Sequence, residues 1–213
     1  MRRYTYKKAF PVWNADLAYV VGIIATDGNL SSSGRHINVT SKDYEMVHTI
    51  KKILRLKNKL SKKARGGTKE KKYYFLQFGD VCLYDFLLSI GLTQAKSKTI
   101  KKLAIPLEYF PDFLRGCIDG DGSIGSFKHP ETVSPQLRVR LVSASHEFLS
   151  WTLHILQKQF YITGGWIYKT KGISTLSFGK NDAIKILRLI YYRKSLPMLS
   201  RKYASAQKFL SGE

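Results

Sequence analysis

The sequence predicts an α+β protein built from two pseudo-symmetric halves, each with its elements in the order αββαββα. Three observations carry this prediction: short segments recur in the same order along the chain, apolar residues follow helical and strand periods in turn, and glycine and proline mark the expected element ends. The halves are expected at residues 1–106 and 107–213, with the boundary near Pro106.

The internal repeat comprises four matches. VVGIIATDG at residues 20–28 corresponds to LRGCIDGDG at residues 114–122. The later matches are INVTSKD at 37–43 with VRLVSAS at 139–145, LQFGD at 76–80 with LSFGK at 176–180, and the surroundings of Lys96 with those of Lys202. Because all four keep their order, we interpret them as a duplication whose loops differ in length.

Each half is expected to begin with an apolar helix, at residues 16–27 and 112–121. Both helices end at Asp-Gly, and we expect Gly28 and Gly122 to adopt the left-handed conformation that ends many helices. Residues typical of helix N-termini precede them, namely Asn14 or Asp16 in the first half and Pro111 with Asp112 in the second.

Strands with alternating apolar and polar residues are expected next, at residues 36–40 and 136–142. A later strand pair ends at Phe78 in the first half and at Phe178 in the second. The remaining helices are expected at residues 44–60, 81–90, 146–160 and 182–190, followed by tails that carry Lys96 and Lys202.

Charge is the most unusual feature of the composition. The chain has 36 Lys and Arg against 15 Asp and Glu, a net charge of +21. Such an excess repels itself in a compact protein unless a polyanion binds, so nucleic acid is the leading partner and an anionic membrane surface is second. Residues 51–72 hold eleven Lys or Arg and one acidic residue, which favours a surface that contacts phosphates.

Several classes are excluded. Cys82 and Cys117 lie far apart, without a C-x-x-C pair, so a disulfide scaffold or a zinc finger is not expected. The longest apolar run, residues 17–25, is far shorter than the ~18–20 residues that span a bilayer. No apolar signal segment follows the basic N-terminus, so we expect a soluble intracellular protein.

The two apolar helices carry the candidate chemistry. Small residues four positions apart, Gly22 with Thr26 and Gly116 with Gly120, would let the helix backbones approach closely. Pairing the helices brings two carboxylates to their C-terminal ends, where two charges ~4 Å apart would repel by about 4 kcal/mol at an effective dielectric near 20. A divalent hard cation such as Mg²⁺ would relieve this repulsion, and metal ions held there could hydrolyse a phosphodiester.

GIIATDG at residues 22–28 and GCIDGDG at residues 116–122 resemble the motif of the LAGLIDADG homing endonucleases. Two copies in one chain resemble the monomeric, two-motif branch of that family, and the likeness covers nearly the whole chain. The resemblance implies that the motif helices pack at the interface between the halves. It also implies two curved antiparallel sheets that form a saddle over double-stranded DNA.

In the family, the last acidic residue of each motif binds metal, and these positions match Asp27 and Asp121. The earlier acidic position is Asp119 in the second copy but Ala25 in the first, so we do not expect Asp119 to be essential. The metal site is assigned to Asp27, Asp121, Thr26 and Gly120. We expect Mg²⁺ or Mn²⁺ there, and Ca²⁺ to bind without supporting cleavage.

A basic residue near each scissile phosphate is another family feature, and it matches Lys96 and Lys202 as further catalytic residues. A lysine can stabilise developing negative charge or order the attacking water. Ser41 and Ser143 match positions where family members often carry a polar residue.

Alternation in the strands selects candidate DNA contacts. In the major groove, arginine pairs best with guanine, and asparagine or glutamine with adenine. The candidates are Arg35, Asn38, Thr40, Lys42, Tyr73, Phe75 and Gln77 in the first half, and Gln136, Arg138, Arg140, Trp166, Tyr168, Thr175 and Ser177 in the second. The lysines of residues 51–72 are expected at phosphates.

The resemblance implies a site-specific double-strand DNA endonuclease that acts in intron homing, cuts a long asymmetric target and leaves 3′ overhangs. One alternative is a maturase of the same fold that binds intron RNA. Another is a non-catalytic DNA-binding or ribosome-associated protein. A membrane partner is not expected, because the basic helix has no broad separate apolar face.

Overall fold

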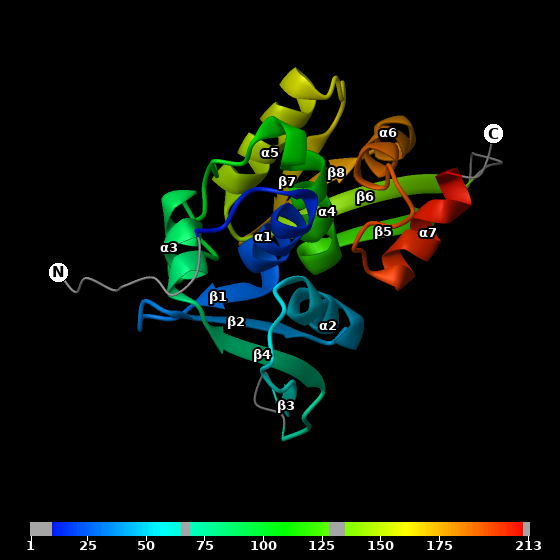
Figure 1. The fold of residues 1–213 in the computed structure, drawn as a ribbon. Coiled ribbons are helices and arrows are strands. Elements are labelled where there is room, and N and C mark those ends of the chain that lie inside the picture. Colours follow the sequence, from blue (N-terminus) through cyan, green and yellow to red (C-terminus); the bar gives the residue numbers. More distant parts are fainter. Residues whose placement is uncertain (1–9, 65–68, 128–134, 211–213) are drawn as a thin grey trace.

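A central pair of helices, α1 (Ala15–Asp27) and α4 (Phe110–Asp121), lies between two antiparallel sheets in the computed structural model (Figure 1). The structure describes residues 10–64, 69–127 and 135–210. Within these ranges each half forms a sheet of four strands, and the order αββαββα is confirmed in both halves.

The first half continues from α1 through β1 (Gly28–Leu30), β2 (His36–Ser41), α2 (Tyr44–Ile53), β3 (Ser61–Lys63), β4 (Tyr73–Gly79) and α3 (Val81–Ser89). The second half begins with the short 3₁₀ helix η1 (Leu107–Tyr109). It continues from α4 through β5 (Gly122–Phe127), β6 (Gln136–Ser143), α5 (His146–Gln159), β7 (Trp166–Thr170), β8 (Ile173–Phe178), α6 (Lys180–Ile190) and α7 (Ser200–Leu210). The division at residue 106 stays a prediction.

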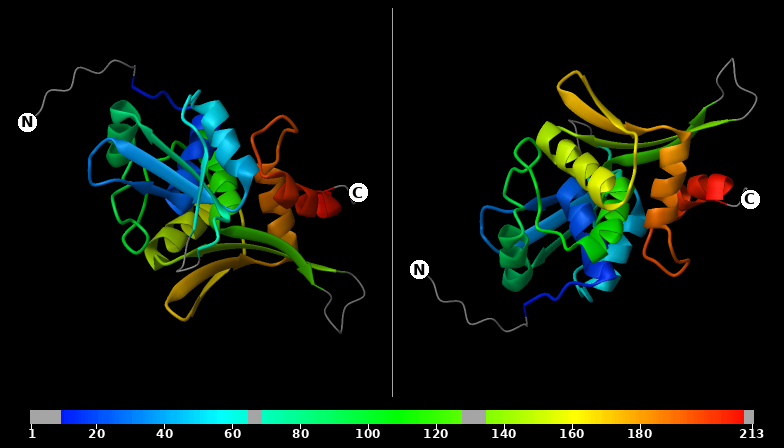
Figure 2. Two further views of the ribbon diagram at one scale, coloured as in Figure 1. Left: turned by 90° about the horizontal axis from the view of Figure 1, so that it is seen from below. Right: turned by 90° about the horizontal axis from the view of Figure 1, so that it is seen from above.

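The two sheets share one topology. The strand orders are β1-β2-β4-β3 and β5-β6-β8-β7, so each strand has a counterpart in the other half. Their registers correspond as well, since Val39 pairs with Leu76 in the first half and Leu141 with Leu176 in the second. These apolar side chains are buried under the helices, and α5 and α6 cover one face of the curved C-terminal sheet (Figure 2).

Three helix ends differ from the prediction. The helix expected to reach residue 60 ends at Ile53, because Arg55 has a left-handed backbone with φ 50°. The left-handed conformation expected at Gly28 and Gly122 is wrong, since both have extended backbones with φ of −87° and −94°. The motif helices run directly into strands, and glycine is needed for space: a Cβ on Gly28 would lie 2.6 Å from the Cα of Ile24.

The motif helices approach as closely as their glycines allow. A Cβ on Gly22 would lie 2.1 Å from the carbonyl oxygen of Phe113, and one on Gly116 would lie 2.1 Å from that of Tyr19. Any larger side chain would force the two backbones apart. The halves therefore share one continuous apolar core, in which α1 is almost completely buried.

A buried arginine ties the C-terminal segment to α4. Arg115 is 0% exposed and pairs with Asp112 at 2.7 Å. It also donates hydrogen bonds to the carbonyl oxygens of Ile190 and Pro197, both at 2.8 Å. Because these carbonyls belong to the segment that leads into α7, Arg115 fixes the position from which Lys202 reaches the end of α4.

Candidate active site and nucleic-acid interface

The paired motif helices bring the two predicted acidic residues to one cavity. Asp27 ends α1 and Asp121 ends α4, and both line a cavity of about 570 Å³ together with Asn38, Thr40 and Lys96. The first carboxylate comes from the N-terminal half and the second from the C-terminal half. The helix C-termini add partial negative charge at the same place.

Lys96 reaches this cavity from a turn that follows α3. Its side chain is 5% exposed, and its ammonium donates a hydrogen bond to the carbonyl oxygen of Gly28, the residue that follows α1. Burial lowers the pKa of Lys96 to about 8, although the carboxylates of Asp121 and Asp27 both oppose that change. The pKa of Lys96 is therefore coupled to the charges of both predicted metal ligands.

Lys202 lies on α7 and caps the end of α4. Its ammonium donates to the carbonyl oxygens of Ile118 at 2.6 Å, Asp119 at 2.8 Å and Gly122 at 2.7 Å, and that of Gly120 lies 3.4 Å away. Burial lowers its pKa to about 8, while the carboxylate of Asp119 is the main opposing influence. An ammonium has three N–H donors, so these carbonyls use all of them.

The two lysine environments therefore differ. Lys202 lines a separate cavity of about 370 Å³ with Gly120, Ser123 and Arg201, whereas Lys96 shares the larger cavity with both carboxylates. Arg201 is held in turn by a bidentate pair with Asp43 of the other half, at 2.9 and 2.7 Å.

The oxygen ligands at Asp27 and Asp121 fit a hard divalent cation that retains several coordinated water molecules. No group of three or more His, Cys, Asp or Glu side chains occurs in the described residues, so protein carboxylates would supply only part of a coordination shell. Mg²⁺ is commonly bound this way, by one or two carboxylates with water and substrate phosphates. The hydroxyl of Thr26 donates to the carbonyl oxygens of Gly22 and Ile23, which fixes this side chain against its own helix.

Gly120, the fourth predicted metal residue, has a packing role. A Cβ there would lie 2.0 Å from the hydroxyl oxygen of Thr26 and 3.4 Å from a carboxylate oxygen of Asp27. Only glycine lets the two helix ends approach this closely. Gly120 therefore sets the spacing between the helices that carry the two carboxylates.

Asp119 contacts protein groups at the interface between the halves. Its side chain is 1% exposed and accepts hydrogen bonds from the hydroxyl of Tyr19 at 2.9 Å and from the backbone N–H of Leu199 at 2.8 Å. Burial raises its pKa to about 6, against the lowering influence of these hydrogen bonds. This carboxylate joins α1, α4 and the C-terminal segment.

Ser41 and Ser143 occupy matching turns. The hydroxyl oxygen of Ser41 accepts from the N–H of Asp43, and that of Ser143 accepts from the N–H of Ser145, both at 3.1 Å. These bonds shape the turns that lead into α2 and α5.

The first sheet places most predicted readers on one face. Asn38 pairs with Gln77 and Thr40 with Phe75, so these side chains share the face opposite the buried Val39 and Leu76. Arg35 is exposed but precedes β2, outside the strand. Lysines lie over the predicted aromatic readers, with the ammonium of Lys42 5.5 Å from the ring centre of Tyr73 and that of Lys63 4.2 Å from Phe75.

The second sheet shows the same alternation. Gln136, Arg138 and Arg140 lie opposite the buried face of β6. Trp166 pairs with Ser177, and Tyr168 pairs with Thr175. Both aromatic rings are more than 40% exposed, but Ser177 is only 1% exposed and is therefore poorly placed to contact a base.

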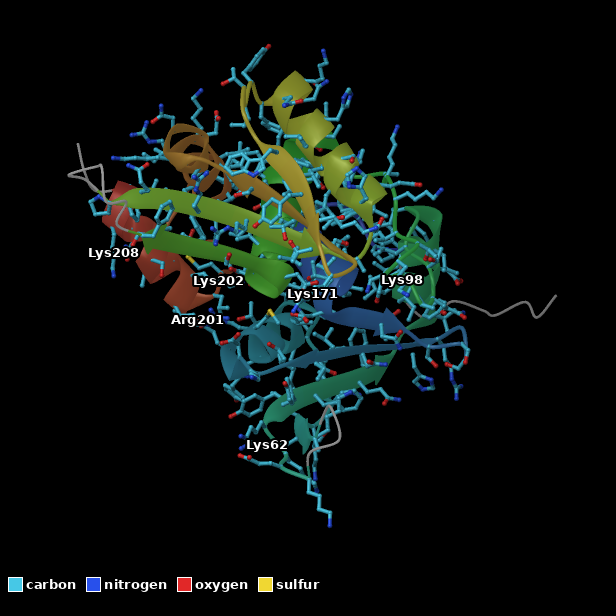
Figure 3. All side chains as sticks on the ribbon, turned by 180° about the vertical axis from the view of Figure 1, so that it is seen from behind. Lys62, Lys98, Lys171, Arg201, Lys202 and Lys208 are labelled. Carbon is cyan, nitrogen blue, oxygen red and sulfur yellow. The ribbon has the colours of Figure 1, made fainter. Side chains whose placement is uncertain are left out.

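Sequence reasoning did not single out three residues beside these groups. Asn29 directly follows the first motif and pairs with Asn38, Lys63 lines the cavity with both carboxylates, and Phe127 lies beside Arg138. The position of Asn29 after Asp27 could have been noticed, as could Lys63 within the basic segment. Residues 65–68 of that segment lie outside the described residues. Figure 3 shows the basic side chains of Lys62, in β3, and Lys171, in the β7–β8 turn.

No model of a protein family matches the sequence, and no curated protein matches it. Among solved structures, the meganuclease I-SmaMI, bound to an uncleaved DNA target in the presence of calcium ions, has a TM-score of 0.60 at 14% identity, covering 94% of this chain and 90% of that one. A structure of mesophilic variants of the homing endonuclease I-DmoI has a TM-score of 0.55 at 16% identity, covering 84% and 96%.

Full-length DUF199/WhiA from Thermatoga maritima has a TM-score of 0.57 at 18% identity over 91% of this chain, which spans 62% of that protein. Its N-terminal LAGLIDADG domain alone gives 0.58 at 16% identity, covering 92% of this chain and 90% of the domain. The chain therefore has the two-half LAGLIDADG fold, as the motifs predict. None of the described helices is both long and apolar enough to cross a membrane.

Proposed function

We propose that this chain is a divalent-metal-dependent endonuclease that binds a long, asymmetric double-stranded DNA target and cuts both strands. The observation that carries the proposal is the meeting of Asp27 and Asp121 in one cavity with Lys96, at the junction of two sheets with polar faces. I-SmaMI, whose fold is similar, was solved on a DNA target with calcium ions, which supports DNA and a divalent cation as ligands.

The carboxylates and the lysine of this site would have different roles in cleavage. Asp27 and Asp121 would hold the cation, which when bound supplies an activated water and neutralises charge on the phosphodiester. Lys96 adds positive charge beside them, in a buried position where an ammonium interacts more strongly with a developing negative charge than in water. The carbonyl oxygen of Gly28 orients that ammonium toward the cavity.

DNA binding would draw on the sheets and the net charge of +21. Lysines contact phosphates and set the register, while the polar strand faces contact base edges. The readers differ between the halves, with Asn38 and Gln77 in one and Arg138 and Arg140 in the other. A target read by unlike halves is asymmetric, and cutting both strands near its centre would leave short 3′ overhangs. Family resemblance also suggests intron homing by a monomer.

The test is cleavage of a randomised duplex library, followed by sequencing of the cut ends. Wild-type protein is assayed in Mg²⁺ and in EDTA and is compared with the variants Asp27→Asn and Asp121→Asn. The matched control is Asp119→Asn, which changes a second carboxylate on α4, the helix that carries Asp121. One long site that is cut in Mg²⁺ by the wild type and the control, but by neither other variant, supports the proposal. Sequence-specific binding without scission under Mg²⁺ or Mn²⁺ would instead identify a non-catalytic DNA-binding protein. Preferential binding of structured intron RNA, again without scission, would identify a maturase.

A further inference from the structure

We propose that Arg138 reads one guanine in the half-site under the C-terminal sheet, and that Trp166 and Phe127 are positioning residues that hold its guanidinium for this contact. The inference rests on the proposed DNA-binding function and names a determinant of its specificity. It changes the role of Trp166 from a direct DNA contact to a residue that acts through Arg138.

Two aromatic rings flank this guanidinium. Its central carbon lies 4.8 Å from the ring centre of Trp166 and 5.5 Å from that of Phe127. In the order β5-β6-β8-β7, Phe127 belongs to an edge strand on one side of β6, while Trp166 belongs to the edge strand on the other side. The rings thus approach Arg138 from opposite directions across the sheet.

The strand neighbours of Arg138 are both glycines, so no neighbouring side chain partners its guanidinium. The direct partner of Arg138 on β5 is Gly125, where an added Cβ would meet nothing within 4 Å. On the side of β8, a Cβ on Gly179 would lie 3.7 Å from a terminal nitrogen of Arg138. The aromatic rings of Phe127 and Trp166 are therefore the side chains that hold the guanidinium on this face of the sheet.

Stacking leaves the donors of the guanidinium available. An arginine that stacks on an aromatic face keeps its N–H groups in the plane of the fork, and within the described residues the Arg138 side chain makes no hydrogen bond or ion pair. The two donors of such a fork match the O6 and N7 acceptors of guanine in the major groove. Holding the fork in advance reduces the side-chain freedom that is lost on binding.

Arg140, two residues along the same strand, has a different environment. Its cross-strand partners are Ser123 and Ser177, and no aromatic ring lies over its guanidinium in the part of the chain that the structure describes. It is the matched arginine for comparison. Of the two arginines, Arg138 has the guanidinium that neighbouring rings hold in place, so we assign the stronger guanine preference to Arg138.

The experiment uses the full chain and a randomised duplex pool, with Ca²⁺ present, to select the preferred site. Binding of all single-base variants of that site is then measured for wild type, Arg138→Lys, Trp166→Leu and Phe127→Leu. Tyr161→Leu, which alters an exposed aromatic residue outside the sheets, is the control for loss of an aromatic ring. The double variant Arg138→Lys with Trp166→Leu tests whether the ring acts through the arginine.

We expect the wild type to prefer guanine at one base pair by roughly 10-fold to 100-fold, the value of a bidentate pair. Arg138→Lys should weaken this preference most, because an ammonium lacks the planar fork, and Trp166→Leu and Phe127→Leu should reduce it several-fold at the same base pair only. The double variant should lose no more than Arg138→Lys alone. Retention of the preference in Trp166→Leu and Phe127→Leu, or its loss at a different base pair, would overturn the inference. If the wild type selects no sequence at all, the proposed function fails instead.

Discussion

Lys202 donates its three ammonium N–H groups to carbonyl oxygens at the junction of α4 and β5, whereas, among the described residues, its counterpart Lys96 donates only to the carbonyl oxygen of Gly28. The two lysines thus hold matching positions in a duplicated fold. They differ in how many of their ammonium N–H donors the described residues engage. Lys96 is the better candidate for contact with a phosphate or water, and Lys202 is primarily a helix cap.

This difference predicts unequal effects of the same substitution. Lys96→Met should lower the cleavage rate roughly 100-fold to 1,000-fold, the usual cost of losing one stabilising donor, with a small change in unfolding free energy. Lys202→Met should lower the unfolding free energy by about 2 kcal/mol or more, because several buried carbonyl oxygens lose their donor. Thermal unfolding and single-turnover cleavage of the selected duplex measure both effects. Equal losses of rate and stability in the two variants would contradict the distinction.

The contact between the motif helices predicts that alanine is not tolerated at its centre. Gly116→Ala places a Cβ 2.1 Å from the carbonyl oxygen of Tyr19, so it should destabilise the fold by more than the ~1–3 kcal/mol of ordinary overpacking. The effect should appear despite the gain of about 1 kcal/mol in helix propensity. Gly125→Ala, which has open space around its Cβ, is the control for urea unfolding. A Gly116→Ala protein as stable as wild type would show that the helices are not packed this closely.

Asp119 predicts a pH dependence of stability. Its pKa is about 6 in the folded protein against 3.8 for the free side chain, so the folded state binds the proton more tightly. The stabilisation from this proton is complete below pH 3.8 and is lost as pH rises through 6. Relative to Asp119→Asn, the unfolding free energy of the wild type should therefore increase by about 2 kcal/mol between pH 7 and pH 4. A difference that stays constant, or that decreases toward acid pH, would contradict the burial of this carboxylate.

The strand β3 belongs to the basic segment at residues 51–72, and it predicts a contribution to DNA binding that does not depend on the base sequence. Lys62 in β3 is exposed and lies 5.2 Å from the ring centre of Tyr74. If it contacts one phosphate, Lys62→Gln should reduce the slope of log K against log salt by about 0.9 and leave the selected sequence unchanged. Titration of the duplex at several salt concentrations measures this slope. A changed base preference with an unchanged slope would place Lys62 at a base instead.

Local patterns in the sequence were sufficient for the order αββαββα of each half and for the paired helices. The alternation of Leu137, Val139 and Leu141 assigned the buried face of β6 correctly. The small residues four positions apart, Gly22 with Thr26 and Gly116 with Gly120, predicted the close helix contact. The extended backbone at Gly28 was missed because an Asp-Gly pair has the same appearance whether a loop or a strand follows.

Long-range contacts account for the rest. No local signal distinguishes Lys202 from Lys96, since the four carbonyls around Lys202 lie eighty or more positions away in the sequence. The aromatic rings beside Arg138 depend on pairing across the sheet. Such contacts are set by tertiary structure, which residue spacing alone does not describe.

The central claim is that one carboxylate from each half builds a shared metal site. Its most direct test is single-turnover cleavage of each strand of the selected duplex in Mg²⁺ by wild type, Asp27→Asn and Asp121→Asn, with binding in Ca²⁺ measured in parallel. We predict that either substitution alone abolishes cutting of both strands while the duplex is still bound. Undiminished cutting of both strands by either variant would contradict the claim.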